Sequence, residues 1–145
     1  MRMPVTILAM AALVISYSAS CGGAKGNFVV YDGPPRPASE VAIIKAASPG
    51  TMISGVDDTV KKRPFHFKQP LEVLPGRHVV HINYCWYGAM GERRTSAQTE
   101  ALEFVAEAGH TYGVKTDGGP RRWRVWIIDQ YDSTSVANEI ESDLQ

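Results

Sequence analysis

Three histidines and a cysteine are the side chains in this sequence best suited to hold a metal ion. His66, His78, His81 and Cys85 lie close together in the chain, and imidazole and thiolate groups suit zinc or copper. In an extended segment His81 and Cys85 share one face. The sequence has no His-x-His, paired-cysteine or His-Glu-x-x-His pattern, so we expect neither a metal site nor any other cofactor.

The sequence also lacks the short motifs that typically mark a catalytic site. The sequence contains no Gly-x-Ser-x-Gly pattern and no cysteine–histidine signature that would indicate an activated nucleophile. Glu72, Glu103 and Glu107 are available for a pair of carboxylates of the kind that cleaves glycosidic bonds. Their spacing singles out no pair, so we expect no catalytic residues.

Arginines alternate with tryptophans in the segment Arg121-Arg122-Trp123-Arg124-Val125-Trp126. Guanidinium groups bind phosphate, anionic glycans or lipid headgroups through paired hydrogen bonds, and they also stack on aromatic rings. Arg121, Arg122 and Arg124 are therefore a candidate patch for an anionic ligand. Two more basic runs in predicted loops can extend it, namely Lys61-Lys62-Arg63 and Arg93-Arg94. The alternative is three separate solvated loops, with a tryptophan of the first segment in the core.

The whole chain carries no excess charge that would indicate nucleic acid as a partner. Fifteen basic residues balance fifteen acidic ones, and nucleic-acid binding typically needs a strong basic excess. A length of 145 residues suits one domain.

The N-terminus predicts export. Arg2 supplies a positive charge, residues 5–15 are almost entirely apolar, and residues 16–20 are mostly small. This order of charge, short apolar run and small residues is typical of a secretory signal. A transmembrane helix needs about 20 apolar residues, which exceeds the length of this run.

The residues around Cys21 suggest a lipid anchor. Ser18-Ala19-Ser20-Cys21 resembles a bacterial lipobox, a resemblance that implies cleavage between Ser20 and Cys21 and acylation of the Cys21 sulfur. Gly22 follows where an Asp would imply retention in the inner membrane, so for a Gram-negative cell the resemblance implies an outer-membrane protein facing the periplasm. Residues 22–26 are rich in glycine and suit a flexible tether.

An ordinary signal peptidase is the alternative, because Ser18-Ala19-Ser20 also satisfies its small-x-small rule. The mature protein would then be soluble. The two predictions differ at Cys85, the only other cysteine. With Cys21 acylated, Cys85 is expected to be a small buried side chain. With Cys21 free, the two cysteines can form a disulfide in an oxidising compartment.

Strand patterns dominate the rest of the chain. Residues 77–87 alternate clearly, with His78, Val80, Ile82, Tyr84 and Trp86 on the expected core face. Residues 102–107 alternate as well, and residues 123–128 are apolar on both faces, which favours a strand flanked on both sides. Pro75-Gly76 predicts a turn before the longest strand, with a positive φ at Gly76.

These patterns predict an all-β protein, a single small antiparallel β-sandwich or open barrel of about seven to eight strands. Residues 1–20 form the predicted lipoprotein signal peptide, 21–26 the tether, 27–130 the sandwich and 131–145 an acidic tail. Val136, Ile140 and Leu144 are spaced by four, so we expect the tail to form one short helix or to remain frayed.

Leu74-Pro75-Gly76-Arg77-His78 at the start of a long strand resembles the PEGA-like β-sandwich modules of bacterial envelope proteins. The chain is also similar to small, uncharacterised Gram-negative lipoproteins. The resemblance implies a lipid-anchored periplasmic module with a non-catalytic binding or structural role. Its partners would be the membrane, through the lipid, and an envelope protein or an anionic glycan or lipid. The alternatives are a metal-binding protein or enzyme using the His81 and Cys85 face, and a docking component of an envelope complex.

Overall fold

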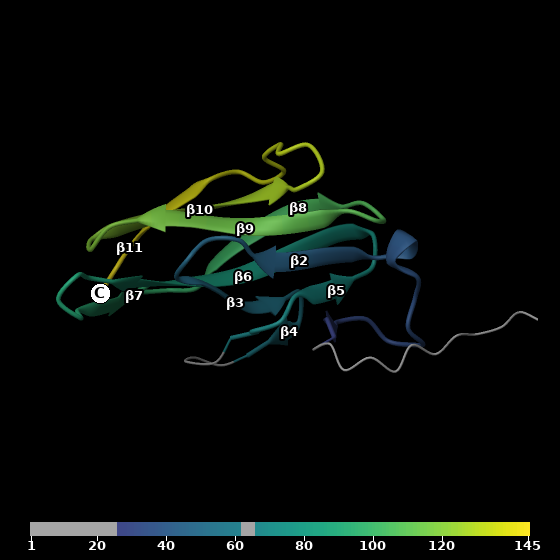
Figure 1. Cartoon of the computed structure of the whole chain (residues 1–145), viewed down its shortest axis with the longest axis horizontal. Helices are drawn as coiled ribbons and strands as arrows, with labels where there is room; N and C mark the ends of the chain where they lie inside the picture. The colour runs from purple at the N-terminus through teal and green to yellow at the C-terminus, as the bar shows by residue number, and fades with distance from the viewer. Residues whose placement is uncertain (1–25, 62–65) are drawn as a thin grey trace, which may run out of the picture.

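The computed structural model describes residues 26–61 and 66–145 and confirms the all-β fold. Eleven strands and one short 3-10 helix, η1 (Ala38–Glu40), make up the regular structure of this part of the chain. The strands form two sheets that enclose one core (Figure 1). Short strands of two or three residues account for the excess over the predicted seven or eight. Ser20 and Cys21, the predicted cleavage and lipidation sites, lie outside the described residues.

The first sheet has six strands. Their order is β1 (Phe28–Val29), β5 (Leu71–Val73), β2 (Ala42–Ala46), β9 (Thr111–Gly118), β10 (Arg122–Asp129) and β11 (Ile140–Asp143). The pairs β1–β5 and β2–β9 are parallel, and the other pairs are antiparallel. As the sequence predicted, β10 is flanked on both sides.

The second sheet is built around the longest strand, β6 (Gly76–Tyr87). One side of β6 pairs with β3 (Thr51–Val56), which in turn pairs with the short β4 (Thr59–Val60). The other side of β6 pairs with β8 (Glu100–Ala106) along residues 76–82 and with β7 (Arg93–Thr95) along residues 85–87. All of these pairs are antiparallel.

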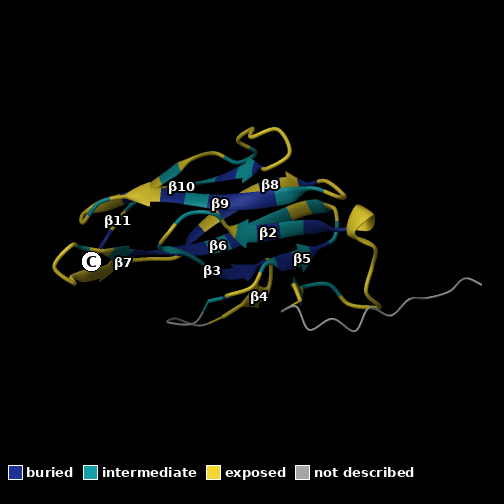
Figure 2. Cartoon of the chain, in the orientation of Figure 1, coloured by how far each residue is buried: buried dark blue, intermediate teal, exposed yellow. Residues whose placement is uncertain are grey.

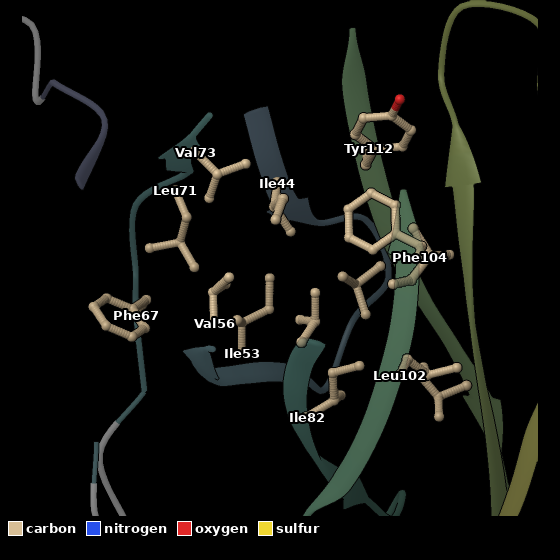
Figure 3. Packing of buried hydrophobic residues seen from close by; sticks show 14 of the residues in the cluster. Ile44, Ile53, Val56, Phe67, Leu71, Val73, Ile82, Leu102, Phe104 and Tyr112 are labelled. Carbon is tan, nitrogen blue, oxygen red and sulfur yellow. The ribbon is translucent and has the colours of Figure 1, made fainter. Parts of the chain in front are cut away.

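Alternating side chains from both sheets form the core. In β8 every second residue is buried, and in β6 Val80, Ile82 and Tyr84 are buried as predicted (Figure 2). Ile44 from the first sheet and Phe104 from the second point into the same apolar space (Figure 3). The two sheets therefore bury a shared interior, as a sandwich requires.

Two glycines lie where the chain changes direction. Gly76 has a φ of +132°, the positive value predicted for the turn before β6. Gly50, between β2 and β3, has a φ of +78°, and a Cβ there would lie 2.2 Å from the carbonyl oxygen of Cys85. Only glycine fits where the chain crosses from one sheet to the other.

The predicted helical or frayed tail is wrong. Residues 140–143 form β11, which pairs antiparallel with β10 from Val125↔Ile140 to Arg122↔Asp143. Leu144 is buried, and its backbone nitrogen donates to the carbonyl oxygen of Arg121. The tail is thus part of the sandwich, because pairing with an open strand edge satisfies backbone groups that a short isolated helix could not.

Candidate functional site

The candidate arginine patch lies on strand β10, whose side chains alternate between the core and solvent. Trp123, Val125 and Ile127 are buried, whereas Arg122 and Arg124 are exposed on the outer face of the sheet. Trp126 shares this outer face and is half-buried. The guanidinium carbon of Arg124 lies 5.6 Å from the centre of the Trp126 ring, as expected for cation–π stacking.

Carboxylates from two neighbouring strands and the preceding loop surround both arginines. Arg124 lies 3.0 Å from Asp117 on β9 and 3.4 Å from Glu139, just before β11. Asp117, followed by Glu139, raises the pKa of Arg124 above its ordinary value. Arg122 lies 3.2 Å from Glu141 and 3.7 Å from Asp143. We call these two arginines and four carboxylates the charged face.

The charged face is not a free basic patch, because its carboxylates outnumber its guanidinium groups. An open depression of about 240 Å³ beside Arg122 is lined by Glu141, Ser142 and Asp143 as well. Arg121 is exposed and makes no ion pair with any residue of the described part. An anionic ligand would have to displace the acidic residues, so the structure does not favour the predicted patch of Arg121, Arg122 and Arg124.

The other basic runs lie elsewhere. Arg93 and Arg94 belong to strand β7 rather than to a loop, and the Arg93 side chain donates a 3.3 Å hydrogen bond to the sulfur of Cys85. Lys61 follows β4, and its ammonium group lies 4.2 Å from the centre of the Phe67 ring. Lys62 and Arg63 lie outside the described residues.

His81 and Cys85 do not converge on a common point. Four residues along a strand span about 13 Å, too far for side chains to meet at metal bonds of about 2 Å. His81 Nε2 contacts the carbonyl oxygen of Asp57 at 3.1 Å, and Cys85 is a buried free thiol beside Arg93. Among residues 26–61 and 66–145, no cluster of three or more His, Cys, Asp or Glu side chains is placed to hold a metal ion. His66 is half-buried next to Phe67.

His78, near the start of β6, contacts the turn between β3 and β4. Its Nδ1 lies 2.7 Å from Oδ2 of Asp57, and its Nε2 lies 2.6 Å from the carbonyl oxygen of Leu74. The other carboxylate oxygen of Asp57 accepts a 2.9 Å bond from the backbone of Val79. Asp57 has a positive φ of 51°. The imidazole therefore links the turn between β3 and β4 to the turn that precedes β6.

The candidate glutamates are separate from one another. Glu72 accepts a 2.6 Å hydrogen bond from the Tyr31 hydroxyl, and Glu103 pairs with Arg77 across β6 and β8. Glu107 lies 3.7 Å from His110 at the end of β8. Each carboxylate has its own partner, and the structure forms no glycosidase-like pair from them.

Sequence reasoning missed the pair formed by His110 and Asp129. His110 Nδ1 lies 2.6 Å from Oδ2 of Asp129, a buried carboxylate whose other oxygen accepts a bond from the backbone of Tyr131. The hydrogen bond with Asp129 raises the pKa of His110 above its ordinary value. The Tyr131 ring lies 5.4 Å from the imidazole. The pair fastens the start of the loop that connects β10 to β11.

A buried polar network was also missed. Asn83 Nδ2 donates to the hydroxyl of Ser54 at 3.1 Å, and Asn83 Oδ1 accepts from the hydroxyls of Ser96 and Thr99 at 3.3 and 3.0 Å. Asn83 lies on the face of β6 opposite Val80 and Ile82 and is nevertheless buried. The network satisfies its buried groups internally, which indicates a structural role.

Comparison of the chain with models of known protein families, with curated proteins and with solved structures finds no match. The part of the chain that the structure describes contains no helix of sufficient length and apolar character to cross a membrane.

Proposed function

We propose that the protein is a lipid-anchored envelope protein whose β-sandwich faces the periplasm and acts by binding, without catalysis of its own. The observation that carries the proposal is the position of Cys21. It follows an apolar run and small residues at a site that resembles a lipobox, and five residues separate it from Asn27 at the start of the sandwich domain.

The fold supports this arrangement because the chain joins the sandwich at a sheet edge. Strand β1 is the outermost strand of the six-stranded sheet, and β11 lies at the opposite edge. An anchor at Cys21 would hold the domain by its β1 edge, leaving β11 and the charged face accessible from the periplasm.

The charged face favours a protein partner over an anionic glycan or lipid. It displays both signs of charge beside the half-buried Trp126. Groups of both signs set the register of protein–protein contacts, whereas four carboxylates repel a polyanion. We therefore propose another envelope protein as the partner of this face.

Detergent-phase partitioning of the protein expressed with its signal tests the anchor. The wild type is expected in the detergent phase and the Cys21→Ala variant in the aqueous phase, because acyl chains contribute about 0.8 kcal/mol per buried methylene. Cys85→Ala is the matched control, since it removes the other cysteine and leaves the lipid site intact. Aqueous wild-type protein would contradict the anchor, as would a Cys21→Ala variant that stays in detergent after its signal has been removed.

The Gly after Cys21 supports the outer membrane as the location. Separation of inner and outer membranes by density tests this, and the Gly22→Asp variant provides the comparison. We expect the wild type in the outer-membrane fraction and the variant in the inner-membrane fraction. Wild-type protein in the inner membrane would contradict the location.

A further inference from the structure

The edge of the sandwich that receives the chain from Cys21 carries two exposed valines and a lysine. They are Val29 on β1, Val60 on β4 and Lys61, and together we call them the tether edge. The ammonium group of Lys61 lies 4.2 Å from the ring centre of Phe67 and 5.9 Å from that of Phe28. These contacts show that β1 and β4, the edge strands of two different sheets, lie on the same side of the molecule (Figure 1).

Both valines of the tether edge are open to solvent. Val29 is 41% exposed and Val60 is 50% exposed, and Lys61, which follows Val60 in the chain, is also exposed. Single exposed apolar residues are common on protein surfaces. Val60 directly precedes Lys61, and Val29 lies on the outermost strand where the chain joins the domain. Exposed apolar side chains near a lysine suit the interface of an anionic bilayer.

The length of the connection limits how far each edge of the sheet can lie from the membrane. Six residue steps separate Cys21 from Asn27, and at full extension they reach about 21 Å. The opposite edge, at β11, lies five strand spacings from β1, or about 24 Å further across the sheet. With Cys21 in the bilayer, the connection therefore keeps β1 within about 21 Å of the headgroups, whereas β11 can lie about twice as far away.

We propose that the tether edge docks on the anionic phospholipid headgroups of the membrane that holds Cys21. Lys61 provides the charge, and Val29 and Val60 contact the interface. This inference rests on the lipid anchor proposed above. A lysine near an anionic surface strengthens binding roughly fivefold, and its effect falls off within about 8 Å at physiological salt. The anchor keeps the tether edge at a high effective concentration near the membrane surface. The weak attraction of a single lysine is therefore enough to favour docking.

Quenching of a dye by spin-labelled phospholipid headgroups tests the docking. The dye is attached through Val60→Cys in one sample and Met90→Cys in another. Met90 is 91% exposed, in the loop between β6 and β7. The native thiol of Cys85 is buried and Cys21 is acylated, so the introduced cysteine is the reactive one. The lipidated protein is reconstituted in nanodiscs of phosphatidylcholine with or without phosphatidylglycerol.

The account predicts strong quenching at position 60 with phosphatidylglycerol and weak quenching at position 90. Lys61→Glu should reduce the quenching at position 60 several-fold, whereas Arg94→Glu, the matched control on β7, should leave it unchanged. Equal quenching at the two positions, or no effect of Lys61→Glu, would overturn the docking. The intact mass of the same samples separates the two proposals. An acylated Cys21 with equal quenching removes the docking alone, whereas an unmodified Cys21 removes anchor and docking together.

Discussion

The tether edge and the charged face both contain residues from basic runs of the sequence. In the fold, the basic residues of the two regions have different neighbours. Lys61 has aromatic rings beneath its ammonium group, and the exposed Val60 precedes it. Arg122 and Arg124 each lie within 3.7 Å of two carboxylates. The difference shows that the neighbours of a basic residue across a sheet, rather than along the chain, decide what it can bind.

Loss of Trp123 is expected to have the largest effect, because this side chain fixes the strand on which the arginines stand. Trp123 is 1% exposed, and its ring stacks on Tyr84 at 5.4 Å. Trp123→Ala should lower the free energy of unfolding by about 3–5 kcal/mol, measured by chemical denaturation.

Two further substitutions sharpen this result. Trp123→Phe should cost much less than Trp123→Ala, since it keeps a ring in the core and removes an indole N–H that has no hydrogen-bond partner among the described residues. Trp126→Ala, on the outer face of the same strand, should also cost less. An equal loss for Trp123→Ala and Trp126→Ala would contradict the assignment of inner and outer faces.

Removal of the acidic residues should turn the charged face into a basic patch. The triple variant Glu139→Gln, Glu141→Gln, Asp143→Asn leaves Arg122 and Arg124 with Asp117 alone. Its affinity for a sulfated polysaccharide should rise roughly tenfold at low salt, which corresponds to about 1.4 kcal/mol, and should fall as salt is added.

A control triple variant separates this local effect from net charge. Asp32→Asn, Glu40→Gln, Asp58→Asn changes the charge equally, at exposed residues outside the charged face. Its affinity should change much less. The same gain from both variants would show that net charge, rather than the uncovered arginines, governs binding.

The smallest effect is a pH dependence confined to the connection between β10 and β11. The pKa of His110 is raised in the folded protein by its hydrogen bond with Asp129. The resulting stabilisation is therefore fully present below the ordinary value of about 6.5 and is lost as pH rises through the raised value. Backbone hydrogen exchange in residues 130–139, corrected for its intrinsic rate, should accelerate over this window.

Asp129→Asn should abolish the pH dependence, and β4 at the tether edge should not show it in either protein. The pKa of His110, followed by NMR, should fall in the same variant. A pKa that stays raised without the carboxylate would contradict the assigned cause.

Local patterns were sufficient to predict much of the fold. Alternation identified the inner face of β6 at Val80 and Ile82, and Pro75-Gly76 identified the turn before it, because pleat and φ are determined by adjacent residues. The all-β class follows from these strands. Strand order was not predictable, since alternation assigns faces and not neighbours.

The candidate site was harder to predict because its contacts are distant in sequence. Glu139 lies 15 residues after Arg124, and Asp129 lies 19 residues after His110. The spacing of Val136, Ile140 and Leu144 suggested a helix, yet the open edge of β10 made strand β11 the better arrangement for the tail. The same pairing converted a predicted basic patch into a mixed-charge face.

The intact mass of the mature protein, extracted from the membrane fraction, is the most direct test of the account as a whole. The account predicts a chain that begins at Cys21 and carries the added mass of a diacylglycerol group and, where the amine is also modified, a further acyl chain. A chain with an unmodified Cys21, recovered from the soluble fraction, would contradict it.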